Sequence, residues 1–166
     1  ADGIAVKAPG KLTLPIVKAL VSRIVLVDEP AIERAICALL TSQKIVAEGA
    51  GVASLAALLT EPGQFRGRKP CLYLSGGNID PRMLASVVVR GLEREGKIVS
   101  LRLTITDQPG VLGRVATILG ASGANILEVY PRRTLLDVPA RGATLDLMIE
   151  TKDKAHASQA IGKLEA

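Results

Sequence analysis

The chain has 166 residues, of which 48% are hydrophobic and 2% aromatic, and its formal net charge is +5. This length fits one domain or two small ones, and this composition predicts an ordered α/β protein whose cores are built from Ala, Val, Leu and Ile. The longest apolar runs, such as residues 52–59, are far shorter than the roughly 20 residues that cross a bilayer, and scattered basic residues with almost no aromatic partners argue against nucleic-acid binding.

The first half of the chain alternates apolar runs with helical patterns. Short apolar runs at residues 24–27, 45–46 and 72–74 are expected to be strands of a buried sheet. Asp28 and Asp80, each followed closely by proline, are expected to cap two of the helices between these runs. This half therefore predicts alternating strands and helices.

The pattern changes at Lys97, where apolar and polar residues begin to alternate through residue 106. A period of two predicts a strand with one solvated face. A turn and a helix that ends at Gly120 and Gly123 are expected next. Then come a strand at 125–130, a basic loop, a strand at 145–149 and a helix over 152–165. The basic loop holds Arg132, Arg133 and Arg141.

This order, βαββα, is that of a ferredoxin-like module without its last strand. The two halves differ in strand type and spacing, so we expect two unlike domains, residues 1–96 and 97–166. The chain opens on Ala1 and Asp2 without a methionine, and we expect it to begin inside a longer protein.

Five motifs resemble known families. "ADGIAVKAPG" from Ala1, "VAEGAG" from Val46 and "LSGGNID" from Leu74 resemble the last catalytic-domain motifs of threonine dehydratases, which are pyridoxal-phosphate-dependent enzymes of fold type II. "DQPGVLGRV" from Asp107 and "GANI" from Gly123 resemble an ACT domain. The resemblance implies an α/β chain: the C-terminal part of a fold-type II catalytic domain, then a ferredoxin-like ACT domain.

The resemblance implies a set of cofactor-binding residues. Ser75 is expected to hydrogen-bond the pyridine nitrogen of pyridoxal 5'-phosphate, and Gly76 and Gly77 to leave room for the flat ring. Glu48 is expected beside the ring, on the side that faces Ser75, and Gly3 as a backbone contact. A hydroxyl cannot fully protonate the ring nitrogen, so the ring is a weaker electron sink, which suits rapid loss of a β-hydroxyl.

Each of these residues also has a purely structural interpretation. Taken without the other motifs, the serine and glycines form an ordinary strand-to-helix turn. Glu48 precedes a glycine-rich helix start, where a carboxylate interacts favourably with the helix dipole.

The catalytic centre is expected to be incomplete. The related enzymes hold the cofactor aldehyde as a Schiff base on a lysine in a Ser-Phe-Lys type motif, and the phosphate in a separate glycine-rich loop. Neither motif occurs in this sequence, so no catalytic residue is expected. Lys7 and Lys44 are expected to be solvated and His156 to lie on the surface. Cys37 and Cys71 are expected to be reduced core thiols.

For the second domain, the resemblance implies an amino-acid effector, isoleucine or valine, at the interface between paired ACT domains of a homo-oligomer. The expected residues are Asp107, Gly110, Gly113 and Asn125. Backbone N–H groups at a helix start suit a carboxylate, and a side-chain amide both donates and accepts. Many related dehydratases carry a histidine close to the position of Tyr130, and this chain has no histidine there.

The leading hypothesis is a cytoplasmic threonine dehydratase that converts L-threonine to 2-oxobutanoate and ammonia. Serine dehydration or racemisation, which uses the same motifs, remains open, as does a stand-alone amino-acid-binding ACT module. Gly49, Gly51 and Ser54 approach a G-x-G-x-x-G pattern. A dinucleotide site is disfavoured because the third glycine and the acidic ribose partner are missing.

Overall fold

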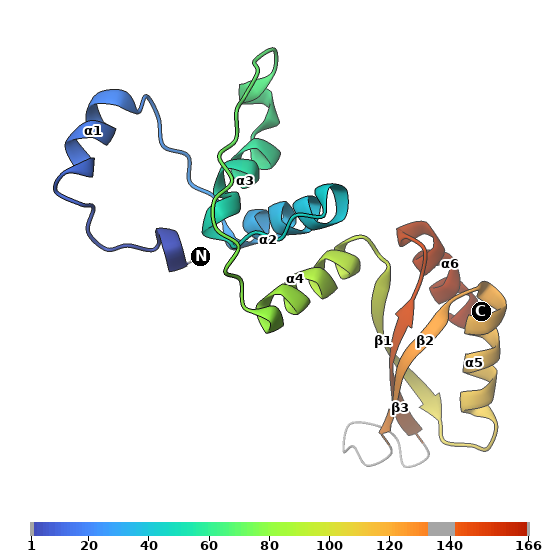
Figure 1. The fold of residues 1–166 in the computed structure, drawn as a ribbon. Coiled ribbons are helices and arrows are strands. Elements are labelled where there is room, and N and C mark those ends of the chain that lie inside the picture. The colour runs from blue at the N-terminus through green and yellow to red at the C-terminus, as the bar shows by residue number, and fades with distance from the viewer. Residues whose placement is uncertain (1, 133–141, 166) are drawn as a thin grey trace. The chain divides into compact units, whose positions relative to one another are not determined.

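The computed structural model describes residues 2–132 and 142–165 (Figure 1). The chain divides into two compact units, Ala1–Gly91 and Leu92–Ala166, and the division falls within helix α4. In the described residues, no helix is long and apolar enough to cross a membrane. Arg133 and Arg141 of the expected basic loop lie outside the described residues, whereas Arg132 ends a strand.

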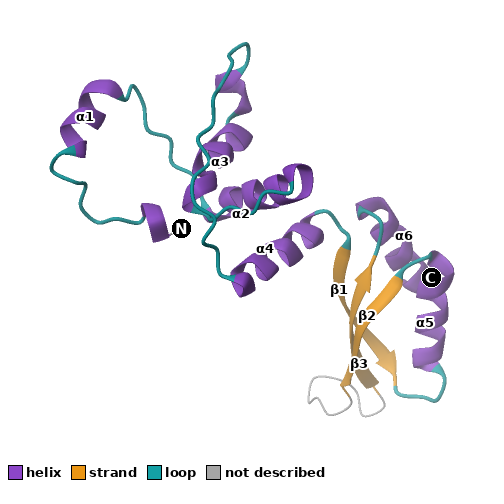
Figure 2. Cartoon of the chain, viewed as in Figure 1, coloured by secondary structure: helices purple, strands orange, loops and turns teal. Residues whose placement is uncertain are grey.

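The first unit is helical in its described residues (Figure 2). Its helices are α1 (Thr13–Leu20), α2 (Glu29–Ala38), α3 (Ala53–Thr60) and the first turns of α4 (Pro81–Arg94). A π-helical turn (Leu39–Gln43) extends α2, and short 3-10 turns cover Asp2–Ile4, Ala50–Val52 and Pro62–Phe65.

Both expected aspartate caps are confirmed. The Asp28 carboxylate accepts a hydrogen bond from the backbone N–H of Ala31 at 2.8 Å, and that of Asp80 from Met83 at 3.0 Å. Each bond satisfies a backbone donor that the first helical turn leaves without a partner.

The three strands expected in the first unit are not formed. Residues 24–27, 45–46 and 72–74 run as irregular or extended chain, and they expose large side chains, with Leu26 at 90% and Tyr73 at 82% relative exposure. A buried strand needs a neighbouring strand to satisfy its N–H and C=O groups. No such neighbour stands beside them in the part of the unit that the structure describes.

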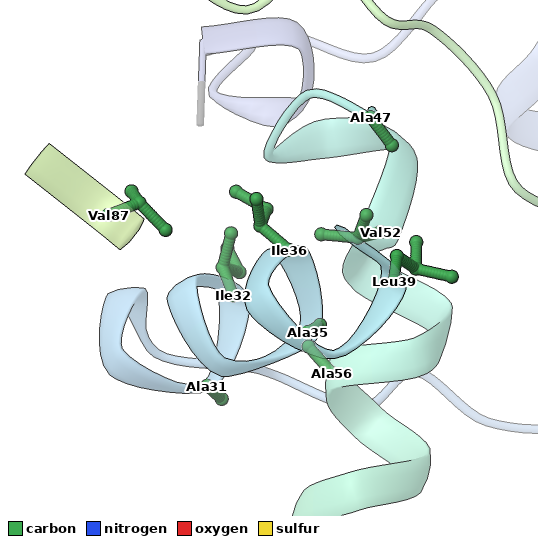
Figure 3. Close-up of a cluster of buried hydrophobic side chains, with 9 residues drawn as sticks. All are labelled: Ala31, Ile32, Ala35, Ile36, Leu39, Ala47, Val52, Ala56 and Val87. Atoms are coloured by element: carbon green, nitrogen blue, oxygen red, sulfur yellow. The ribbon is translucent and has the colours of Figure 1, made fainter. Parts of the chain in front are cut away.

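The core of the first unit packs α2 against α3 and α4 (Figure 3). Val87 of α4 is directed at Ile32 and Ile36 of α2. The buried cluster comprises Ala31, Ile32, Ala35, Ile36, Leu39, Ala47, Val52, Ala56 and Val87. It is built from Ala, Val, Leu and Ile, as the composition predicted.

The second unit has the predicted βαββα order. It consists of β1 (Ile98–Thr106), α5 (Val111–Ser122), β2 (Asn125–Arg132), β3 (Gly142–Glu150) and α6 (Lys154–Glu165). The sheet is antiparallel in the order β1-β3-β2, and α5 and α6 lie on one of its faces (Figure 1). The buried cluster is Val115, Leu119, Ala124, Leu145, Leu147, Ile149 and Ala160.

Glycine ends two of the helices, as expected. Gly96 has a φ of +68° and Gly123 a φ of +84°. In this left-handed region an L side chain is strained. The N–H groups of Lys97 and Ala124 close the ends by donating to Leu92 and Leu119 at 2.8 and 3.1 Å. Gly120 lies within α5 rather than at its end.

The expected surface position of His156 is wrong. Its ring is half-buried: Nδ1 accepts from the Lys152 backbone N–H at 3.1 Å, and Nε2 lies 2.8 Å from the Ser122 carbonyl oxygen. In this arrangement Nδ1 is the acceptor and Nε2 is the donor. The side chain thereby ties the end of α5 to the residue that precedes α6. The sequence could not predict these contacts, because the partners of the ring are backbone groups and not particular side chains.

The two cysteines differ. Cys37 is half-buried, and its thiol donates to the Val87 carbonyl oxygen at 3.3 Å. Cys71 is exposed, so its expected core position is wrong. The run that contains Cys71 is apolar but pairs with no strand, which leaves its side chains open. Lys7 and Lys44 are exposed, as expected.

Candidate functional site: a cofactor pocket and a regulatory domain

The three motifs of the first unit, far apart in the chain, meet in space. The Glu48 N–H donates to the Gly76 carbonyl oxygen at 3.2 Å, and the Ser75 N–H donates to the Gly51 carbonyl oxygen at 3.4 Å. The segment that carries Ser75 and Gly76 therefore runs beside residues 48–51. Gly3 joins them, because a Cβ atom on it would lie 2.9 Å from the Cβ of Ala50.

Glycine is required where these segments touch. A Cβ on Gly76 would overlap the Glu48 carboxylate, and a Cβ on Gly51 would overlap the Ser75 carbonyl oxygen. Gly76 also has a φ of +76°. The Glu48 side chain thus lies directly against the Gly76 backbone.

A cavity of about 420 Å³ opens at this junction. Gly3, Glu48, Gly49, Ala50 and Asn78 line one part of it, and side chains of α2 and α4 line the rest. Ser75, Gly76 and Gly77 do not line this cavity, and all three are exposed. Among the described residues, the Ser75 hydroxyl has no hydrogen-bond partner, which leaves it able to donate or accept.

These residues fit the edge of a flat heterocycle. The available hydroxyl of Ser75 suits a ring nitrogen, the bare backbone of Gly76 and Gly77 permits close approach, and Glu48 supplies a carboxylate within contact of Gly76. Four of the expected cofactor residues are joined by the contacts around Ser75 and Glu48. Gly77 follows them in the chain and lies near Val46, whose carbonyl oxygen would be 3.3 Å from an added Cβ.

In the second unit, the expected effector residues are not together within one chain. The turn with Asp107, Gly110 and Gly113 follows the end of β1, and Gly110 has a φ of +89°. Asn125 begins β2 and lies opposite Glu150, which in turn lies opposite Ile98 at the start of β1. The eight steps from Ile98 to Thr106 separate the two sites by about 25 Å at the usual rise of a strand.

Each site has its own surroundings. The turn borders a small hollow of about 40 Å³ that includes Asp107 and Pro131. The Asn125 amide donates to the Glu150 carboxylate at 3.3 Å. The open start of α5 offers backbone N–H groups.

The sequence did not predict an ion-pair network on the sheet face away from the helices. Arg102 donates to both Asp146 carboxylate oxygens at 2.6 and 3.1 Å, and Arg132 lies 3.1 Å from the second oxygen. The hydrogen bond from Arg102 is the main reason why the pKa of Asp146 lies below its usual value. In the sequence, Arg102 and Asp146 each stand at a polar position of an alternating strand. Which residues pair, however, depends on the register between the strands.

Comparison with known proteins assigns the two units. Residues 1–77 match the family described as "Pyridoxal-phosphate dependent enzyme", and residues 99–166 match the family described as "ACT domain". Each part of the chain is thus similar to one of these two families. The family and the fold class expected from the sequence are confirmed. The exact boundary at residue 96 stays a prediction.

Several curated relatives of this chain have related names. "L-threonine ammonia-lyase" of Thermotoga maritima is 40% identical over 159 residues, and that of Geobacter sulfurreducens is 40% identical over 165 residues. These matches cover 96% and 99% of this chain but 39% and 41% of the relatives. "L-threonine dehydratase catabolic TdcB" of Escherichia coli K12 is 48% identical over 82 residues, which is 48% of this chain and 25% of that protein. The chain therefore spans about two fifths of the first two relatives' length.

Proposed function

We propose that this chain is the C-terminal part of a threonine ammonia-lyase that converts L-threonine to 2-oxobutanoate and ammonia. One observation carries the proposal: the segments that contain Gly3, Glu48 and Ser75 contact one another, and the Ser75 hydroxyl is free to form a hydrogen bond. The names of the two relatives that match nearly the whole chain support it. The protein is further proposed to be cytoplasmic, because its two free cysteines fit a reducing compartment.

In this proposal Ser75 holds the ring nitrogen of pyridoxal phosphate by a hydrogen bond, while Gly76 and Gly77 let the backbone approach the ring. Glu48 lies against the Gly76 backbone and places its carboxylate near the ring, and Gly3 closes the site from the N-terminal segment. The bound cofactor supplies an electron sink for loss of the substrate's β-hydroxyl. Because serine is neutral, it positions the ring without fixing a proton on its nitrogen.

The Ser75 hydroxyl should be needed for rate but not for cofactor attachment. In the complete enzyme, we expect Ser75→Ala to lower kcat about tenfold or more, since one hydrogen bond of about 1.4 kcal/mol to the reacting system corresponds to that factor. Cofactor absorbance should persist. Steady-state kinetics and absorption spectra measure both quantities.

Ser86→Ala is the matched control. The Ser86 hydroxyl donates to Arg82 within α4 at 3.0 Å, so its removal leaves the site untouched. An undiminished rate in Ser75→Ala would show that Ser75 is not the partner of the ring nitrogen.

We also propose that ACT domains of two chains pair and bind an amino-acid effector, isoleucine or valine, between them. Each copy carries the α5 turn at one end of its sheet and Asn125 at the other. Two copies related by a twofold axis, with strands antiparallel, bring the turn of one copy toward Asn125 of the next. The outer edges of β1 and β2 have no partner strand among the described residues, and such edges invite pairing.

Effector binding should then depend on Asn125. For the complete enzyme, we expect Asn125→Ala to weaken binding of L-isoleucine or L-valine about tenfold, the effect of one lost hydrogen bond of about 1.4 kcal/mol. Isothermal titration calorimetry measures the affinity. Gln159→Ala, which changes an exposed amide on α6, is the control.

Two results would reject this arrangement. Unchanged affinity in Asn125→Ala would remove Asn125 from the site. A strictly monomeric enzyme in sedimentation equilibrium would remove the pairing.

A further inference from the structure

We propose that Gly51 and Ser54 are positioning residues for Ser75: together they set where its hydroxyl stands. This inference rests on the proposed cofactor role of Ser75 and adds the residues that make that role possible. Neither residue needs to touch the cofactor. Both act through the backbone of the segment that carries Ser75.

Gly51 acts by having no side chain. It is buried, and a Cβ atom there would overlap the Ser75 carbonyl oxygen, with the Ser75 carbonyl carbon at 2.7 Å and the Gly76 carbonyl oxygen at 3.0 Å. The atoms it would meet are all backbone, so no flexible side chain can turn away. Its φ does not lie in the left-handed region where glycine is favoured for conformation. Glycine is therefore required at position 51 because there is no room for a side chain, and not because of its backbone conformation.

Gly51 also forms a hydrogen bond with the segment that contains Ser75. Its carbonyl oxygen accepts the Ser75 N–H at 3.4 Å. The same residue thus limits how closely Ser75 approaches and keeps it from moving away.

Ser54 fixes the same segment two residues earlier. Its hydroxyl donates to the Tyr73 carbonyl oxygen at 2.9 Å. The Tyr73 side chain is 82% exposed and Ser75 is exposed as well, so side-chain burial does not anchor this stretch. With the bond from Glu48 to Gly76, the contacts at Tyr73 and Ser75 form a row that holds the backbone on both sides of the hydroxyl.

A small displacement of this row has a large consequence. Hydrogen bonds weaken as the donor–acceptor distance grows beyond the usual range, about 2.7–3.2 Å for an N–H···O bond, and the bond from the Ser75 N–H to Gly51 is already long at 3.4 Å. A methyl group at Gly51 would push the Ser75 backbone by about 1.5–2 Å to restore normal carbon–oxygen contact, and a misplacement of only about 1 Å is enough to cost about a hundredfold in rate.

The first test uses this chain and needs no cofactor. We expect Gly51→Ala to change the backbone amide NMR shifts of Tyr73, Ser75 and Gly76 and to speed hydrogen exchange at Ser75. Ser54→Ala should give a smaller change in the same residues, and Ser54→Thr, which keeps the hydroxyl, should restore them. Gly63→Ala is the control, because a Cβ there meets nothing within 4 Å.

The second test uses the complete enzyme and distinguishes positioning from a general structural role. If Gly51 acts through Ser75, Gly51→Ala lowers kcat at least about tenfold, shifts the cofactor absorption band in the direction that Ser75→Ala shifts it, and adds little further loss in the Gly51→Ala/Ser75→Ala double variant. A general loss of stability would instead multiply the two effects.

The outcomes separate the inference from the function it rests on. Unchanged Ser75 amide signals in Gly51→Ala, or fully additive losses in the double variant, would overturn the positioning role. A native complete enzyme that binds no pyridoxal phosphate would overturn the proposed function, while the amide measurements would still decide whether Gly51 and Ser54 position Ser75.

Discussion

The purified chain, mixed with L-threonine and pyridoxal phosphate, should form 2-oxobutanoate no faster than free pyridoxal phosphate does. The related enzymes hold the cofactor through a lysine in a Ser-Phe-Lys type motif and a glycine-rich phosphate loop, and the sequence contains neither. The residues gathered around Ser75 contact one edge of the ring in our proposal. They cannot attach its aldehyde, and covalent attachment is needed for this chemistry.

A coupled assay for 2-oxobutanoate measures this rate, with free cofactor as the baseline and the complete enzyme as the positive control. Lys7→Met and Lys44→Met variants test the two lysines that flank the motifs. Turnover above the baseline that disappears in either variant would contradict the prediction, because it would identify a catalytic lysine within this chain.

Leu145→Ala should destabilise the second unit by about 2–5 kcal/mol, the usual cost of removing a large side chain from a packed core. Leu145 is 1% exposed, lies on the central strand β3 and belongs to the cluster under α5 and α6. Native domains are stable by only about 5–15 kcal/mol. A large fraction of the second unit should therefore unfold under mild denaturant.

Hydrogen exchange of the β3 amides measures this change and is preferable to a single melting curve, because the chain has two units. Ser100→Ala, on the exposed side of β1, is the control and should alter stability by less than about 0.5 kcal/mol. A loss below about 1 kcal/mol in Leu145→Ala would mean that the core closes over the missing side chain.

The two units differ in how well local patterns predicted them. In the second, alternation in β1 and β3 and the glycine at the end of α5 predicted elements that the structure contains. The reason is that each strand of the second unit has its antiparallel partner within the same unit. In the first, runs at 24–27 and 72–74 looked like buried strands but stand unpaired in the described residues.

Motifs identified the residues that we expect at the cofactor, but they did not predict how these residues contact one another. Nothing in the sequence indicated that Glu48 lies against Gly76, or that Gly51 admits the Ser75 carbonyl. His156 was placed wrongly for the same reason. Its partners, the Lys152 N–H and the Ser122 carbonyl, are backbone groups that every residue carries.

By itself, then, the sequence determined that helices begin after Asp28 and Asp80 and that one ends at Gly123, because caps and periodicity act over a few neighbouring residues. It also determined the order of elements in the second unit. Only the tertiary structure decided that Gly51, Ser54 and Glu48 line up along the Ser75 segment, and that the turn at Asp107 and the side chain of Asn125 lie at opposite ends of one sheet. Such contacts depend on how distant segments pack and in which register strands pair, and neither is encoded in any local stretch.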